Sequence, residues 1–170
     1  IEGRFATWAG TLLNKDIPII IVAEANPVEE AVMRLGRIGF HNVKGYLKDG
    51  MESLKNHTDL ISKTQRISAA AIDELKGETT IIDIRNENEW EVGHIEGSIS
   101  IPLNHLADRI AKVPVSGQVI VHCQGGYRSM IAASLLVKES RSNVFDLVGG
   151  YQAWVTTKRP VIASVKQAEN

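Results

Sequence analysis

The residues with the clearest chemical potential lie in one short segment, CQGGYRS, which begins at Cys123. Gly125 and Gly126 permit backbone conformations that side chains block, so that several N–H groups can converge on one anionic atom. Arg128 adds a permanent positive charge, and a helix expected to begin at Ser129 would place the positive end of its dipole behind the sulfur. These features favour the thiolate, which is the nucleophilic form of cysteine. The segment therefore predicts a nucleophile at Cys123 in an anion-binding loop.

The same cysteine also has a structural interpretation, because a lone cysteine is commonly a small buried apolar residue. A core cysteine does not require two adjacent glycines, an arginine and a helix start directly behind it. We therefore keep the nucleophile interpretation and assign the stretch from Gln124 to Ser129 to a substrate-binding loop. Within it, Gln124 and Tyr127 are expected to shape the choice of substrate and are given no part in the chemistry.

Two charged residues, Asp83 and Arg85, follow an apolar, β-rich run. They form either an ion pair that supports the loop or a solvated pair worth less than about 1 kcal/mol. Ligands of open parallel sheets bind at the carboxyl ends of the strands, and this favours the supporting role. Trp90, His94 and Trp154 are interpreted as packing and hydrogen-bonding residues.

The elements that must position these residues alternate between strands and helices in the second half of the chain. Extended runs cover residues 79–83, 98–102, 118–122 and 143–148. Helical patterns cover residues 69–76, 87–93, 104–113, 129–139 and 151–155. This alternation predicts an α/β fold, in which a parallel sheet is flanked by helices on both faces.

The first part of the chain repeats a portion of this plan. It shows a strand at 17–23, a helix that starts with the cap Asn26, and a strand at 42–47, and alignment puts Glu24 at the place of Cys123. No counterpart of residues 79–102 is present. We therefore predict a partial, degenerate and inactive unit at 5–55, a linker at 56–66 and a catalytic unit at 67–163. Such a partial unit exposes apolar surface unless it packs on a neighbour, which predicts a homo-oligomer or a missing partner domain.

Three motifs, in this order, resemble the rhodanese family over roughly residues 68–160. The early motif is matched by IDIR, Glu89 and GHIEGSISIP, the active loop by CQGGYRS, and the late motif by LVGGYQAW. The resemblance implies a rhodanese-like parallel sheet and a sulfurtransferase. It implies that Cys123 takes the outer sulfur of thiosulfate or a persulfide donor and passes it to cyanide or a thiol acceptor. Neither a cofactor nor a metal is implied.

The length of the loop bears on the alternatives to sulfur transfer. Four residues separate Cys123 from Arg128, whereas the related phosphatase and arsenate-reductase loops hold one residue more and form a wider cradle. The tighter loop favours sulfur. The position of His122 directly before the cysteine resembles the active-site loop of the phosphatases, but a histidine that ends a buried strand is more commonly structural. A third alternative is a non-catalytic interaction module, and the retained cysteine, glycines and arginine count against it.

A wider resemblance concerns the segment FATWAGTLL, which precedes the degenerate unit. This order resembles the tail of fusion proteins that begin with a metallo-β-lactamase-like domain holding non-haem iron, of the persulfide dioxygenase type. The resemblance implies that the chain is the sulfur-transfer part of a sulfide-detoxification enzyme whose N-terminal domain is missing here.

Composition narrows the classes of partner and compartment. The 19 basic and 20 acidic residues nearly cancel, so no broad attraction to nucleic acid or anionic lipid is expected. The apolar runs are far shorter than the ~20 residues that cross a bilayer. With one cysteine in 170 residues, no internal disulfide can form. We expect a cytoplasmic protein whose partners are a small-molecule or protein sulfur donor and a thiol acceptor.

Overall fold

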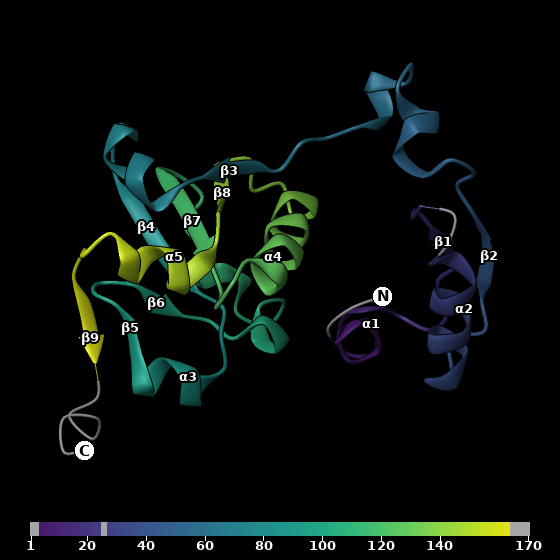
Figure 1. Cartoon of the computed structure of the whole chain (residues 1–170), viewed down its shortest axis with the longest axis horizontal. Coiled ribbons are helices and arrows are strands. Elements are labelled where there is room, and N and C mark those ends of the chain that lie inside the picture. Colours follow the sequence, from purple (N-terminus) through teal and green to yellow (C-terminus); the bar gives the residue numbers. More distant parts are fainter. Residues whose placement is uncertain (1–3, 25–26, 164–170) are drawn as a thin grey trace. The chain divides into compact units, whose positions relative to one another are not determined.

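Five parallel strands form the sheet that carries the second half of the chain. The computed structural model describes residues 4–24 and 27–163, and in it these strands lie in the order β3-β8-β7-β4-β6. They are β3 (Gln65–Ile67), β4 (Thr79–Asp83), β6 (Ile99–Ser100), β7 (Gln118–His122) and β8 (Val144–Leu147). The sheet and its flanking helices are shown in Figure 1. The prediction of an α/β fold with a parallel sheet is confirmed.

Helices cover both faces of this sheet. They are α4 (Tyr127–Lys138) on one face and α5 (Gly150–Thr156) with the 3-10 helix η3 (Ala69–Glu74) on the other, whereas α3 (Glu87–Val92) packs on the strand that directly follows it. Trp154 of α5 packs with Ile120 of β7 and Leu147 of β8 in one buried cluster. Side chains alternate along a strand, so Asp146 points to the opposite face, where it meets Ser129 of α4. A separate antiparallel pair, β5 (Gly93–Ile95) with β9 (Val161–Ala163), completes this half.

Residues 104–113 do not form the continuous helix that their apolar spacing predicted. The chain makes two short 3-10 helices instead, η4 (Leu103–His105) and η5 (Ile110–Lys112). Leu106 and Val113 are nonetheless buried, so the apolar pattern marked the buried side of an irregular segment. Periodicity over so short a stretch does not distinguish an α-helix from successive tight turns.

The chain divides into two compact units between Ser62 and Lys63, called unit 1 and unit 2 below. The 3-10 helix η2 (Thr58–Leu60) lies within the predicted linker, and strand β3 begins at Gln65. The last two residues that we assigned to the linker therefore pair with β8 and belong to the sheet of unit 2. No helix of the described residues is long and apolar enough to cross a membrane.

The described part of unit 1, residues 4–24 and 27–62, contains a two-stranded parallel sheet and two α-helices. Its elements are α1 (Phe5–Leu12), β1 (Ile19–Ile21), α2 (Val28–Arg37), β2 (Val43–Tyr46) and the 3-10 helix η1 (Gly50–Leu54). Its buried cluster joins Ala9 of α1, Ile21 of β1 and Leu35 of α2. The predicted cap Asn26 lies outside the described residues, and Pro27 occupies the N-cap position of α2 where we expected the first helical position.

The internal repeat is visible in the backbone of the two units, with one shift from our alignment. Gly50 after β2 and Gly150 after β8 both have positive φ, at 55° and 59°. A Cβ at Gly50 would lie 2.8 Å from the carbonyl oxygen of Ala23, and one at Gly150 would collide with that of Cys123. The counterpart of the cysteine is therefore Ala23, and our placement of Glu24 there was wrong by one residue. Neither the methyl group of Ala23 nor the carboxylate of Glu24 can carry a sulfane sulfur.

Candidate active site

Cys123 stands directly after β7, at the carboxyl end of a central strand, with 2% of its surface exposed. The N–H of Gly126 donates to the sulfur at 3.1 Å, and the Ser129 hydroxyl lies 3.7 Å from it. Gly126 has φ 109°, a conformation that favours glycine, whereas Gly125 has no positive φ. Of the two glycines that we expected to shape the loop, Gly126 is thus the one whose backbone requires it.

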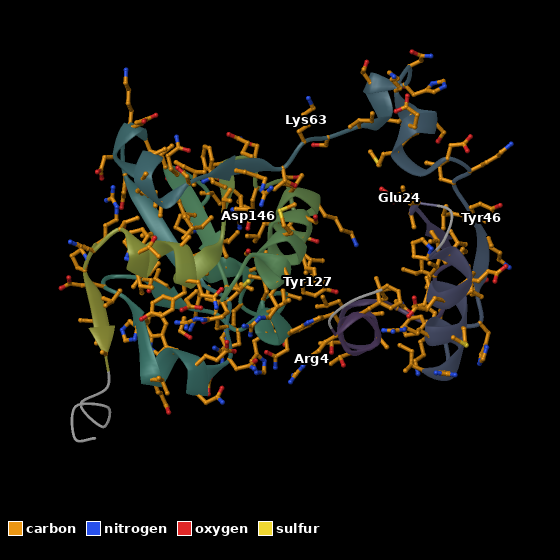
Figure 2. All side chains as sticks on the ribbon, in the orientation of Figure 1. Arg4, Glu24, Tyr46, Lys63, Tyr127 and Asp146 are labelled. Atoms are coloured by element: carbon orange, nitrogen blue, oxygen red, sulfur yellow. The ribbon has the colours of Figure 1, made fainter. Side chains whose placement is uncertain are left out.

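Helix α4 begins earlier than predicted, at Tyr127 with Gly126 as its N-cap. The residues that we assigned to the end of the loop, Tyr127 to Ser129, therefore form the first turn of this helix. Ser129 is buried, and its hydroxyl lies 2.5 Å from Asp146 Oδ1 on β8. Asp146 in turn accepts from Arg66 Nε of β3 at 3.1 Å. Figure 2 marks Tyr127 and Asp146, which come to the site from different elements.

The start of the cysteine loop is held by the N-terminus of α5. The N–H of Tyr151 donates to the carbonyl oxygen of Cys123 at 2.7 Å, and that of Gln152 to the oxygen of Gln124 at 3.1 Å. Gly150 leaves no room for a side chain against these two carbonyls. The GGYQ part of the late motif therefore clamps the loop. From the sequence we interpreted this motif only through its family resemblance and assigned it no such role.

We predicted either an ion pair or a solvated pair for Asp83 and Arg85. The two side chains form an ion pair, and it is buried. Arg85 Nη2 lies 2.6 Å from Asp83 Oδ2, and both side chains are at most 3% exposed. The same guanidinium donates to the carbonyl of Gly93 at 2.7 Å and to Gln124 Oε1 at 3.2 Å. It also lies 4.2 Å from the ring centre of Tyr151. These contacts hold Arg85 from several elements, so the pair is a rigid support beside the loop.

Arg128 is bound by Glu89 of α3, a partner that sequence reasoning did not supply. Two parallel hydrogen bonds of 2.6 and 2.7 Å join the guanidinium to the carboxylate. This ion pair lowers the pKa of the Glu89 carboxyl, against the opposing effect of burial. It also raises the pKa of Arg128, with smaller contributions from the nearby Cys123. The positive charge that we expected the loop to offer is therefore matched by a carboxylate.

His122 is fully buried beside Cys123, and its two ring nitrogens face Asp83 and the backbone carbonyl of Cys123. Its Nε2 lies 3.6 Å from Asp83 Oδ2, and its Nδ1 lies 3.3 Å from the carbonyl oxygen of Cys123. Burial lowers the pKa of the imidazole, and the Asp83 carboxylate opposes this effect in part. The structural interpretation of His122 agrees with this geometry.

The aromatic and histidine residues of the early and late motifs also hold structural positions. The rings of Trp90 and His94 stack with their centres 3.7 Å apart. Trp154 Nε1 donates to the carbonyl oxygen of Pro160 at 3.2 Å. These contacts agree with the packing and hydrogen-bonding roles that we predicted.

A pocket of about 460 Å³ adjoins the loop. Its volume lies within the range of small-molecule sites. It is lined by Arg85, Asn88, Glu89, Val92, Gly93, Gln124, Tyr151 and Ala163. Gln124 lines this pocket, and its influence on substrate choice stays a prediction. Tyr127 is not part of its wall, and half of its surface is exposed.

Comparison with known proteins identifies the family to which this site belongs. The profile of the rhodanese-like domain matches residues 68–157, just over half of the chain. This chain belongs to the rhodanese-like domain family. The match spans β4, the loop of Cys123 and helix α5, so it contains each motif that carried the resemblance.

Relatives include proteins named as thiosulfate sulfurtransferases. The chain is 36% identical over 84 residues to the thiosulfate sulfurtransferase GlpE of Pseudomonas fluorescens, covering 49% of this rhodanese-like chain and 77% of the relative. It is 38% identical over 74 residues to the uncharacterized protein YqhL of Bacillus subtilis. That alignment covers 44% of this chain and 59% of YqhL, so the chain spans little more than half of that relative.

A solved structure supports the same fold. The rhodanese-related protein from Thermoplasma volcanium is 30% identical, with a TM-score of 0.52. The superposition covers 58% of this chain and 97% of that protein. The likeness is thus to a single rhodanese-like domain. The metallo-β-lactamase-like partner that the wider resemblance implied stays a prediction.

Proposed function

We propose that this chain is a sulfurtransferase in which Cys123 carries a sulfane sulfur as a persulfide. The Cys123 thiolate attacks the outer sulfur of thiosulfate, a new S–S bond forms, and sulfite leaves with the electrons of the broken S–S bond. Cyanide or a thiolate then attacks the outer sulfur of the persulfide and releases the Cys123 thiolate. No external oxidant or reductant is needed for this exchange.

One observation carries the proposal: the sulfur lies at the end of β7 with the N–H of Gly126 directed at it. A backbone N–H held by a helix N-terminus stabilises a negative charge on an atom at that place. The carbonyls on the other side of the loop are bound by α5, so the loop keeps its shape while the sulfur changes partners. The named activity of the GlpE relatives agrees with this chemistry.

The phosphatase and arsenate-reductase alternative receives less support from the site. Such an enzyme binds a tetrahedral oxyanion, for which a loop arginine with a free fork of donors is suited. Arg128 uses both terminal nitrogens of its guanidinium on Glu89. We found no observation that favours a pure interaction module over a sulfur carrier.

The first test is the transfer of sulfur from thiosulfate to cyanide, with the protein's mass measured after incubation with thiosulfate alone. The wild type should gain the mass of one sulfur atom on Cys123. Cys123→Ser should lose transfer by about 10³-fold or more, because no other group can hold the sulfur. Circular dichroism should show the same fold, because serine is close in size.

A matched control tests whether turnover requires a thiol at position 123 or only a thiol anywhere on the protein. Ser116 is exposed in the turn before β7. In the Cys123→Ser background, Ser116→Cys should restore a thiol without restoring turnover. Substantial turnover by Cys123→Ser, or by that double variant, would contradict the assignment of Cys123 as nucleophile.

A further inference from the structure

Both guanidinium groups beside the cysteine loop are bound by a carboxylate. Arg85 pairs with Asp83, and Arg128 pairs with Glu89. Each pair is bridged by hydrogen bonds from more than one guanidinium nitrogen. The charges of the two pairs therefore cancel locally, and the mouth of the site offers little net positive charge to an incoming anion.

The two pairs differ in whether a substrate can reach them. The Asp83–Arg85 pair is closed off, with side chains 1% and 3% exposed. In the other pair, Arg128 and Glu89 are 16% and 28% exposed. Glu89 also contributes to the wall of the pocket beside the loop. Arg85 lines the pocket but is almost fully buried, so Arg128 is the more exposed guanidinium of the two, and Glu89 in the pocket wall is the charge that a donor meets beside it.

We infer that Glu89 determines donor specificity by neutralising Arg128 at the mouth of the site. The inference rests on the proposed sulfurtransferase function and specifies its donor class. A dianion such as thiosulfate gains most from an unpaired arginine and is repelled most by a nearby carboxylate. The persulfide of an uncharged thiol is much less affected by either charge. Glu89 thus shifts donor use away from thiosulfate and toward persulfides of low charge.

The reaction with such a persulfide balances without further reactants. The Cys123 thiolate attacks the outer sulfur of R–S–SH, and the bond between the two donor sulfurs breaks. The thiolate RS⁻ leaves with the electron pair, while the transferred sulfur keeps its proton and forms Cys123–S–SH. The leaving group is a thiolate in this case and sulfite in the case of thiosulfate.

The experiment measures the rate constant for loading Cys123 by rapid quenching and mass spectrometry, with thiosulfate and with 2-mercaptoethanol persulfide. Glu89→Gln keeps the size of the side chain and its acceptor oxygen for the capping bond with Asn86. We expect it to raise loading from thiosulfate by about three- to tenfold. Loading from the persulfide, which carries at most one negative charge, should change less than about twofold.

A double-variant cycle distinguishes charge from structure. Arg128→Gln should lower loading from thiosulfate, and the charge-balanced pair Glu89→Gln with Arg128→Gln should return the donor ratio toward that of the wild type. Added salt should slow the thiosulfate reaction of Glu89→Gln more steeply than that of the wild type. If Glu89 only held Arg128 in place, Glu89→Gln would show the same salt dependence as the wild type.

Two further variants serve as controls for fold and charge. Glu91 lies on the same helix α3, is exposed and is outside the pocket wall, so Glu91→Gln should keep the wild-type donor ratio. Glu89→Asp keeps the charge and should keep the ratio as well, even where its shorter reach weakens the pair with Arg128.

An unchanged donor ratio in Glu89→Gln, or an equal loss with both donors, would overturn the role of Glu89 while leaving the sulfur-carrier proposal intact. A wild type that loads no sulfur on Cys123 from either donor would overturn the proposed function, and this inference with it.

Discussion

At the scale of single residues, the surroundings of Cys123 come from segments far apart in the sequence. Ser129 has one hydroxyl proton and two acceptors, and its short 2.5 Å contact with Asp146 favours donation there over the 3.1 Å contact with Gly126. The serine oxygen is then free to accept a hydrogen bond from the Cys123 S–H whenever the cysteine is protonated. A buried aspartate on β8 thereby sets the direction of a hydrogen bond at the nucleophile.

The buried His122 makes stability depend on pH. Burial lowers its pKa below the ordinary value of 6.5, so just below that pH the unfolded chain binds a proton that the folded chain does not. The free energy of unfolding therefore falls as pH decreases below 6.5, by up to about 1.4 kcal/mol per pH unit, until the lower pKa of the folded state is reached. Well above pH 6.5 the imidazole is neutral in both the folded and the unfolded state, so this loss of stability is absent.

Urea unfolding between about pH 5 and 7.5 measures this effect. The wild type should lose stability toward the acid end, and His122→Gln, which cannot titrate, should show a shallower slope. Equal slopes for the two proteins would contradict the assignment to His122. The lowered pKa of Glu89 acts in the same direction but below its ordinary value of 4.5, outside this range.

Sequence reasoning found residues whose signal is local and missed those whose partner is distant. Cys123 and Gly126 share one loop, and the Asp83–Arg85 pair is separated by a single residue. Glu89 and Arg128, by contrast, are 39 positions apart. Their pairing depends on where α3 lies relative to α4, which no spacing in the sequence encodes. The signal that existed was the presence of Glu89 in the early motif.

At the scale of elements, strands with continuous apolar runs were predicted within a few residues. The strand QVIVH matches β7 in full, and its last four residues are entirely buried. The start of α4 was placed two residues late because Gly126 was interpreted as part of the loop, whereas it is the N-cap. Residues 104–113 were misassigned because burial of apolar residues at helical spacing does not require helical hydrogen bonds.

Adjacent isoleucines of β1 provide a test of how unit 1 is packed. Ile21 is 9% exposed and belongs to the buried cluster with α2, whereas Ile20 on the other face is 59% exposed. Ile21→Thr should lower the stability of unit 1 by about 1–3 kcal/mol, because it removes buried apolar contacts and buries a hydroxyl. Ile20→Thr should change it by less than about 0.5 kcal/mol.

Hydrogen exchange of the α2 amides, followed by mass spectrometry, reports this difference within unit 1. Faster exchange in Ile21→Thr than in Ile20→Thr is expected. Equal acceleration by both variants would show that the Ile20 face is also covered in solution, in which case the apolar surface has a partner there.

At the scale of the whole molecule, the repeat was detectable from sequence, but its exact register was not. Unit 1 has counterparts of β7, α4 and β8, and of the turn at Gly150. Its loop after β1 differs so much that alignment there had no anchor, and the carbonyl contact at Gly50 was needed to match Ala23 with Cys123. The missing counterpart of residues 79–102, a feature visible in the sequence itself, is the basis of our prediction of a partial unit.

Each residue described around the active site belongs to unit 2. The ion pairs of Arg85 and Arg128, the α5 clamp and the contact between Ser129 and Asp146 all lie between residues 83 and 152. The five-stranded sheet that supports them begins at Gln65, after the boundary between the units. Unit 1 supplies Ala23 in place of the nucleophile, so we expect it to add no sulfur-carrying group.

A chain of residues 63–170 should therefore transfer sulfur by itself. We expect its kcat/KM for thiosulfate to stay within about threefold of the full chain, equivalent to less than about 0.7 kcal/mol of transition-state stabilisation. The measurement compares the two proteins at equal concentration, with circular dichroism to verify the fold of the shorter one. A folded 63–170 chain with activity reduced by more than about tenfold would show that unit 1 contributes to the site, either by contact or by assembling copies of the chain.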